Sequence, residues 1–236
     1  MSATAAGELW VCNLGQLPYR EATAMQEQIR AARQAGLIPD VLLLLEHDAV
    51  YTRGRRSSAS ELPMGESWYL GQGIDVVQTD RGGKLTYHGP GQLVGYPIMR
   101  IDDVVVYLRT MEQAMIAALN DEDIGAEVRE GLTGVWVGER KIGSIGVHVS
   151  RGVTTHGFAV NVENDLQPFE WVVPCGLEGV RMTSVTRETD RGAGAIKCFR
   201  RHTAWRFAEA FGRRQRLISP ARLEQAVNAS PVPLPA

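Results

Sequence analysis

The 236-residue sequence predicts an α+β fold. Between Asp103 and about Asn120, apolar residues recur at spacings of three and four, which is typical of an amphipathic helix. From Ala126 the apolar period changes to two, and three short stretches at 134–137, 140–150 and 156–162 alternate as strands do. Amphipathic helices combined with a run of short antiparallel strands favour the α+β class.

The N-terminal part predicts a strand, a helix and a second strand. Leu9–Cys12 is a short apolar stretch, and residues from about Tyr19 to Gln34 place their apolar side chains on one helical face. Gly36 can end this helix, because glycine adopts the left-handed conformation that helix termini favour. Val41–Leu45 is a run of five aliphatic residues, which predicts a strand buried on both faces.

Two further strands are predicted on either side of a glycine-rich loop. They are Ile74–Gln78 and Leu93–Ile98, and the polar residues 57–73 before them are expected to form a mobile surface loop. His47 directly follows the aliphatic strand. We expect it to be a structural histidine that bonds to a backbone carbonyl, and we assign it no catalytic role.

The C-terminal half begins with the helix at 103–120, for which Asp102 or Asp103 can serve as the N-cap. Its expected core stripe consists of Val104, Leu108, Met111, Met115 and Leu119. The pairs 138–139 and 151–152 are expected to form the turns between the three strands. Residues 163–186 are expected to form an irregular loop, and Ser219-Pro220 predicts the start of a last short helix.

The composition restricts the class of protein. The formal net charge of −2 does not indicate nucleic-acid binding, and the N-terminal stretch lacks the basic and apolar regions of a secretory signal. Three cysteines suggest free thiols in a reducing cytoplasm. No CxxC or HExxH motif occurs, so we expect no metal site.

Residues 81–93, RGGKLTYHGPGQL, combine four glycines and a proline with many hydrogen-bonding side chains. Glycine lets a ligand approach the main chain closely, and backbone N–H groups beside a cation can hold an oxygen anion. The alternative is two tight turns around a short hairpin, since Gly-Gly and Pro-Gly are common turn pairs. These residues alone favour a functional loop but leave both possibilities open.

The run RGGKLTYHGPGQLVGYP resembles the signature of the lipoyl(octanoyl) transferases, which are octanoyl-[acyl carrier protein]:protein N-octanoyltransferases of lipoate synthesis. KIGSIGV at 141–147 and PCG at 174–176 resemble further motifs of that family, in the same order. The likeness covers roughly residues 8–186. It implies one catalytic domain over 1–236, with a mixed, largely antiparallel sheet flanked by helices as in biotin and lipoate ligases, and a divergent basic segment from about 187.

Three cysteines are candidates for the nucleophile that takes an acyl group from a thioester. Cys12 lies in an apolar strand and is expected to be a core residue, whereas Cys198 lies among basic residues that could lower its pKa. Cys175, between proline and glycine, ranks only slightly higher on its own surroundings. The resemblance decides for Cys175, because it matches the acyl-thioester cysteine of the family.

Lys141 opens a strand after a turn, so it could be an ordinary solvated lysine at a sheet edge. By resemblance it matches the lysine that lowers the pKa of the nucleophile. The resemblance also implies a set of substrate-binding residues: Arg81, Gly82, Gly83, Lys84, Leu85, Thr86, Tyr87, His88, Ser144, Ile145, Gly146, Gly157, Phe158 and Ala159. The sequence departs from the usual pattern at Lys84-Leu85 and at Phe158, which could narrow the acyl pocket.

The resemblance implies transfer of octanoyl from octanoyl acyl carrier protein to a lysine on lipoyl domains of 2-oxoacid dehydrogenase complexes and on glycine cleavage H protein. It implies no cofactor, no nucleic acid, no membrane and a cytoplasmic monomer. One alternative is an ATP-dependent lipoate or biotin ligase, which would need no cysteine. The other is a non-enzymatic binding module that uses the basic stretch at 187–216.

That basic stretch carries nine Arg or Lys against three acids, a net charge of +6 (9 − 3). One hypothesis is that Arg200, Arg201, Arg213 and Arg214 dock an acidic carrier protein. The alternative, equally compatible with the sequence, is a solvated face balanced by acids elsewhere in the chain.

Overall fold

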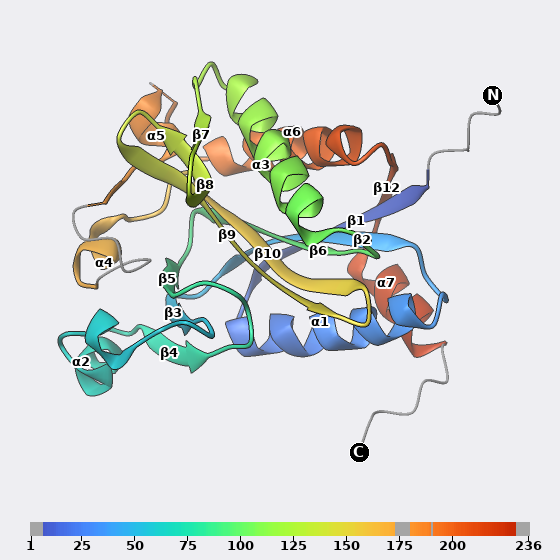
Figure 1. The fold of residues 1–236 in the computed structure, drawn as a ribbon, viewed down its shortest axis with the longest axis horizontal. Helices are drawn as coiled ribbons and strands as arrows, with labels where there is room; N and C mark the ends of the chain where they lie inside the picture. The colour runs from blue at the N-terminus through green and yellow to red at the C-terminus, as the bar shows by residue number, and fades with distance from the viewer. Residues whose placement is uncertain (1–6, 173–179, 190, 230–236) are drawn as a thin grey trace.

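The computed structural model describes residues 7–172, 180–189 and 191–229 (Figure 1). Within these ranges the main sheet has nine strands, in the order β12-β1-β2-β6-β10-β9-β8-β7, with β11 beside β9. The strands are β1 (Glu8–Leu17), β2 (Asp40–His47), β6 (Gln92–Ile98), β7 (Glu127–Arg129), β8 (Leu132–Val137), β9 (Arg140–Ser150), β10 (Val153–Asn161), β11 (Arg181–Met182) and β12 (Arg214–Ile218). Pairing is antiparallel from β2 to β7 and parallel for β1 with β2 and β12.

A smaller sheet lies beside the main one and carries the glycine-rich loop. Its order is β4 (Asp75–Gln78), β3 (Val50–Arg53), β5 (Leu85–His88), with β3 parallel to β4 and antiparallel to β5. The loop at 79–84 joins β4 to β5, so the loop ends are fixed by the two outer strands of this sheet.

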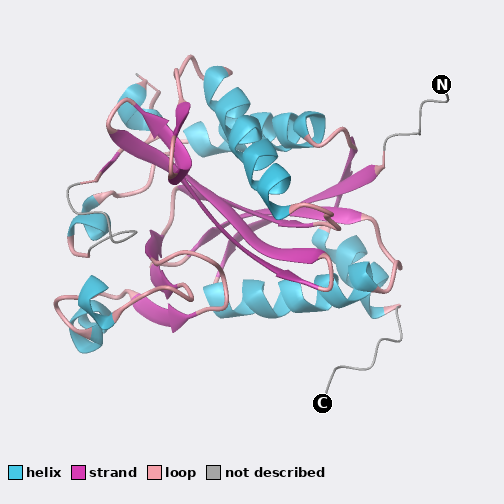
Figure 2. Cartoon of the chain, viewed as in Figure 1, coloured by secondary structure: helices cyan, strands magenta, loops and turns pink. Residues whose placement is uncertain are grey.

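Helices cover both faces of the main sheet (Figures 1 and 2). On one face lie α1 (Tyr19–Gln34) and α7 (Pro220–Asn228), and on the other lie α3 (Val104–Asn120) and α6 (Ala195–Ala210). Shorter helices are η1 (Ala59–Glu61), α2 (Glu66–Gly71), α4 (Gln167–Glu170) and α5 (Val185–Glu188). In the described ranges, each helix is too short or too polar to span a bilayer.

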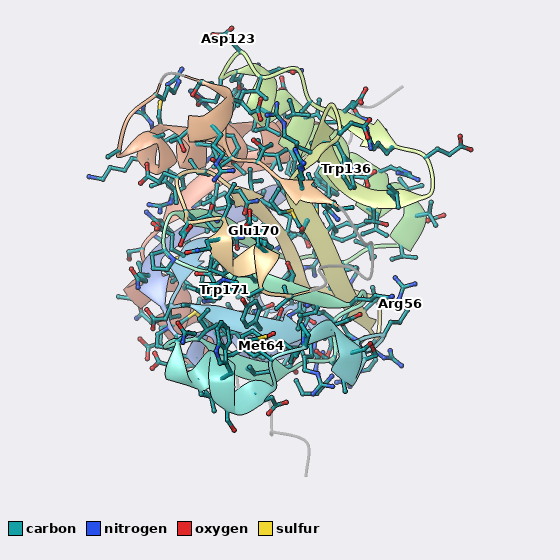
Figure 3. All side chains as sticks on the ribbon, turned by 90° about the vertical axis from the view of Figure 1, so that its left-hand side faces the viewer. Arg56, Met64, Asp123, Trp136, Glu170 and Trp171 are labelled. Atoms are coloured by element: carbon teal, nitrogen blue, oxygen red, sulfur yellow. The ribbon has the colours of Figure 1, made fainter. Side chains whose placement is uncertain are left out.

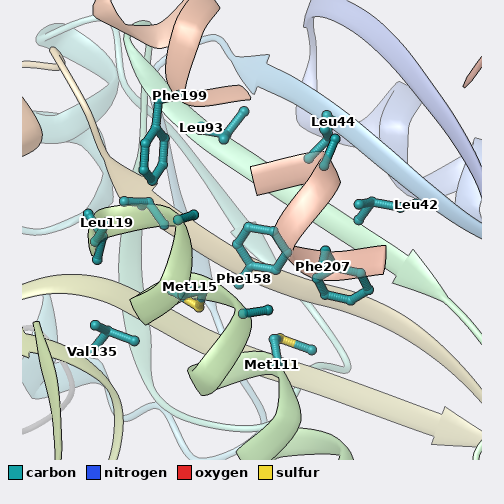
Figure 4. Close-up of a cluster of buried hydrophobic side chains, with 14 of the residues drawn as sticks. Leu42, Leu44, Leu93, Met111, Met115, Leu119, Val135, Phe158, Phe199 and Phe207 are labelled. Atoms are coloured by element: carbon teal, nitrogen blue, oxygen red, sulfur yellow. The ribbon is translucent and has the colours of Figure 1, made fainter. Parts of the chain in front are cut away.

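The aliphatic strand β2 separates two hydrophobic cores. Leu42 and Leu44 pack into the core beneath α3 and α6, which Figure 4 shows around Phe158 and Phe207. Val41, Leu43 and Leu45 pack into the core beneath α1. The strand is therefore buried on both faces, as its uninterrupted run of aliphatic residues predicts.

The structure confirms the α+β class and several local predictions. The first helix has the predicted bounds and ends before Gly36, which has a φ of +74°. Asp103 is the N-cap of α3, because its carboxylate accepts hydrogen bonds from Val105 N and Val106 N. Ser219 caps α7 in the same way through the backbone of Arg222.

Other predictions were wrong. Residues 57–73 contain η1 and α2, and Tyr69 of α2 packs into a small core shared with β3, β5 and α4. Residues 163–186 contain α4, α5 and β11. These elements have only two to six residues, too few for a periodic pattern to be seen. Val104 is 44% exposed, so the core stripe of α3 does not include its first turn. The strand β12 was not predicted, because its sequence RQRLI shows no alternation of apolar and polar residues.

Candidate active site

The glycine-rich loop lies across the junction of the two sheets. Arg81, which is 7% exposed, donates from Nε and Nη2 to Thr52 Oγ1 on β3 at 3.2 and 2.8 Å. On the other side, Gly82 N donates to Val147 O on β9 at 2.9 Å. The loop therefore bridges β3 and β9, and it is a built part of the fold rather than two independent surface turns.

Glycine is required where this loop touches the strands. A Cβ on Gly146 in β9 would lie 2.8 Å from Gly82 O, and a Cβ on Gly54 would lie 2.5 Å from Gly83 O. Both clashes are with backbone atoms that cannot rotate away. Gly83 itself has a φ of +88°, which side-chain-bearing residues rarely adopt.

A narrow cavity opens where the loop, β9 and β10 meet. Twelve of the fourteen residues expected to bind substrate line it, namely Arg81, Gly83, Lys84, Leu85, Thr86, His88, Ser144, Ile145, Gly146, Gly157, Phe158 and Ala159, and so does Lys141. Gly82 instead lines a neighbouring groove. Tyr87 is the exception, because its ring packs against Tyr51 and Phe169 in the small core.

Phe158 lines the cavity, but its ring belongs to the main core. It stacks on Phe207 with 5.9 Å between centroids, and its ring fills the space above Gly95, where a Cβ would lie 2.2 Å from the ring (Figure 4). The side chain therefore supports the sheet beneath the cavity. The expected narrowing of the acyl pocket by Phe158 stays a prediction.

Lys141 is not a solvated edge lysine. It lies in β9, where it pairs with Trp136 of β8 and Met182 of β11, and is only 4% exposed. Its Nζ donates to Thr133 O at 3.1 Å and lies 5.4 Å from the ring centroid of Trp136. A cation over an aromatic face is held electrostatically, so this lysine is fixed at the cavity by the fold.

Sequence reasoning missed three aromatic or titratable residues that line the cavity: Tyr19, Tyr96 and His156. His156 Nε2 lies 2.7 Å from Asp80 Oδ1, and its Nδ1 lies 3.3 Å from the Tyr19 hydroxyl. The hydrogen bond from His156 holds the pKa of Asp80 at about 2. His156 has a φ of +56°, an uncommon conformation for a residue with a side chain, and such conformations cluster at functional sites.

His47 is a structural residue beneath the cavity, as expected. Its Nδ1 donates to Leu17 O at 2.7 Å, and its Nε2 accepts from the Tyr96 hydroxyl at 2.7 Å. Burial lowers its pKa to about 4. His88, which faces His47 at 5.8 Å between ring centroids, also has its pKa lowered well below the usual value by burial.

The three cysteines differ in what the structure says of them. Cys12 is a fully buried core residue, as expected, and burial raises its pKa to about 11. Cys198 lies on α6, partly exposed, 3.6 Å from Arg201 Nη2. Cys175 lies outside the described residues, so its pairing with Lys141 stays a prediction.

The basic stretch is largely neutralised within the molecule. Six of its nine basic residues form ion pairs with acids of the described ranges: Arg191, Arg200, Arg206, Arg213, Arg214 and Arg216. Arg200 pairs with Glu46 at 2.8 Å, and Arg213 pairs with the buried Asp40 at 3.1 Å. These contacts favour the structural role over carrier docking.

Comparison with known proteins agrees with this geometry. Residues 18–206 match the family described as the lipoyl protein ligase A/B catalytic domain. The chain belongs to this family. An octanoyltransferase from Solibacter usitatus is 52% identical over 168 residues, covering 70% of this chain and 76% of that protein. One from Thermobifida fusca is 43% identical over 189 residues, covering 75% and 78%. The identity to these octanoyltransferases indicates that the protein is an acyltransferase.

Solved structures share its fold. A putative lipoate protein ligase from Thermoplasma acidophilum with bound lipoic acid superposes with a TM-score of 0.74 at 21% identity, covering 95% of this chain and 94% of that chain. A lipoate-protein ligase A bound with ATP gives a TM-score of 0.73 at 22% identity, covering 95% and 93%. The predicted ligase-like architecture is therefore confirmed.

Proposed function

We propose that this protein transfers an octanoyl group from octanoyl acyl carrier protein to the ε-amine of a lysine on lipoyl domains, through a thioester on Cys175. Octanoyl transfer in lipoate biosynthesis agrees with the identity to curated octanoyltransferases. The observation that carries the proposal is the cavity, which gathers Lys141 and twelve residues of the three expected substrate-binding stretches from distant parts of the chain.

Two half-reactions are proposed. The Cys175 thiolate attacks the thioester carbonyl, a carbon–sulfur bond forms, and the carbon–sulfur bond to the carrier breaks to release its thiol. The lysine amine then attacks the new thioester, an amide forms and Cys175 leaves as the thiolate. Lys141 supplies a proton to the leaving carrier thiolate and accepts one from the attacking amine.

Described residues flank the segment that holds Cys175. Val172, three positions before it, packs into the small core, and Met182, seven positions after it, pairs with Lys141 in the sheet. Thr183 N also donates to Lys141 O at 2.9 Å. The chain therefore returns beside Lys141 within a few residues of the proposed nucleophile, which supports a cation acting on its thiolate.

The tetrahedral oxyanion would be stabilised by donors of the 81–88 loop and of β9. We propose that the whole chain is one catalytic domain, because β12 near its C-terminal end completes the sheet beside β1. It would act as a cytoplasmic monomer on the lipoyl domains of dehydrogenase complexes and on glycine cleavage H protein. The free thiols of Cys12 and Cys198 fit a reducing compartment.

Intact-mass spectrometry after incubation with octanoyl carrier protein tests this mechanism. The protein should gain one octanoyl group on Cys175 without ATP, and Cys175→Ser should gain none. Peptide mapping that places the group on Cys198, or transfer that requires ATP, would contradict it. The second result would favour a ligase that forms an acyl adenylate.

A further inference from the structure

A groove lies next to the cavity and opens to the surface. It has a volume of about 450 Å³ and is lined by Arg56, Gly82, Gly83, Lys84, Val104, Leu108, Gly131, Leu132, Thr133, Lys141, Ile145, Gly146 and Val147. We call it the outer groove. Five of these residues, including Lys84 and Lys141, also line the cavity, so the two spaces adjoin at the lysine of the proposed mechanism.

The outer groove is apolar along its walls and positive at its rim. Val104 and Leu108 of α3 line it together with Ile145 and Val147 of β9, which explains why Val104 is apolar although it lies outside the core. Arg56 lies at the surface (Figure 3), and its backbone N donates to Gly83 O at 3.0 Å. Among the described residues that line the groove there is no carboxylate.

Arg56 differs from the arginines of the basic stretch. No ion pair holds it within the described ranges, and both its side chain and that of the preceding Arg55 are exposed. Lys84, on the same rim, is 3.9 Å from Glu61, a weak contact. Positive charge available for a ligand therefore lies on Arg56, in the segment that follows β3, and on Lys84 of the glycine-rich loop, whereas most of the C-terminal arginines are ion-paired.

We infer that the outer groove binds the phosphopantetheine arm of the acyl donor, with its phosphate at Arg56 and its thioester at Lys141. The inference rests on the proposed function. The arm has an anionic phosphate at one end, a gem-dimethyl group and amides along its length, and the thioester at the other end. This order matches a positive rim, apolar walls and a cavity holding a cation.

The acceptor fits the groove less well than the donor. Its reactive group is a lysine amine, which is protonated in water near neutral pH. A rim with Arg56 and Lys84 repels that charge, which favours the donor over the acceptor as the occupant of the groove.

Two small thioesters separate the arm from the rest of the donor. The ratio of kcat/KM for octanoyl-4′-phosphopantetheine to that for octanoyl-pantetheine isolates the contribution of the phosphate. We expect the unmodified enzyme to favour the phosphorylated thioester by about threefold to fivefold at low salt, which is the upper range for an exposed ion pair. The ratio should fall as salt is added, because exposed charges are screened.

Arg56→Gln should bring this ratio close to one. The matched control is Arg201→Gln, which removes an exposed arginine of the basic stretch that has no ion pair in the described ranges, and it should keep the ratio. Equal rates with both thioesters in the unmodified enzyme, an unchanged ratio in Arg56→Gln, or loss of the ratio in Arg201→Gln would overturn the inference.

The complete octanoyl carrier protein provides the last comparison. If Arg56→Gln slows transfer from the carrier and leaves the ratio for the small thioesters unchanged, Arg56 contacts the protein surface of the carrier, and the assignment to the arm is wrong. If none of the three donors supports octanoyl transfer, the proposed function itself is refuted. The two failures are therefore distinguishable.

Discussion

Acid should weaken the fold beneath the cavity through His47. This side chain is fully buried, and its pKa is about 4, compared with about 6.5 in an unfolded chain. Below pH 6.5 the unfolded state therefore binds a proton that the folded state does not bind. The stabilisation is complete above pH 6.5 and is lost progressively as the pH falls toward 4.

The expected size follows from this difference. Each pH unit between the two pKa values costs about 1.4 kcal/mol, so His47 should lower the free energy of unfolding by about 2 kcal/mol between pH 7.5 and pH 5. Urea unfolding at both pH values measures the loss. His47→Gln should be less stable at pH 7.5, because the hydrogen bonds to Leu17 and Tyr96 change, but its stability should fall by about 2 kcal/mol less on acidification.

The comparison of the two losses of stability is diagnostic, because groups remote from His47 titrate equally in both proteins. An identical loss of stability in the unmodified protein and in His47→Gln would show that His47 is protonated in the folded state. That result would refute the account of a neutral histidine that donates to Leu17 and accepts from Tyr96.

Three other outcomes are expected. Gly146→Ala places a Cβ 2.8 Å from the oxygen of Gly82. It should therefore lower the free energy of unfolding by about 1–3 kcal/mol and kcat/KM by at least about tenfold. Unchanged kinetics would show that the glycine-rich loop moves freely. Asp103→Ala removes the N-cap of α3 and should cost about 1 kcal/mol in urea unfolding, with no change expected if water replaces the carboxylate. Thiol labelling at pH 8 should modify Cys198 in the native protein and Cys12 only after unfolding, because burial raises the pKa of Cys12 to about 11. Labelling of Cys12 in the native protein would contradict this.

Local patterns were sufficient wherever one element determines its own conformation. The helix at 19–34, the N-cap Asp103 and the buried strand at 41–45 could be predicted, because spacing, capping chemistry and continuous apolar runs act within a few residues. The motif residues could be named only by resemblance, because glycines and a lysine are common on any surface. Short elements such as α4 and β11 escaped prediction, since neither has enough residues for a period.

The sequence by itself determined the α+β class, the boundaries of α1, α3 and β9 and a set of candidate residues. Tertiary structure decided which of them meet. Lys141 is buried over Trp136 because β8 and β9 pair there, and Tyr87 turns into a core because β5 pairs with β3. Tertiary ion pairs also neutralise most of the C-terminal arginines, whereas Arg56 stays exposed. Such pairings join residues that are tens of positions apart, and no local pattern encodes them.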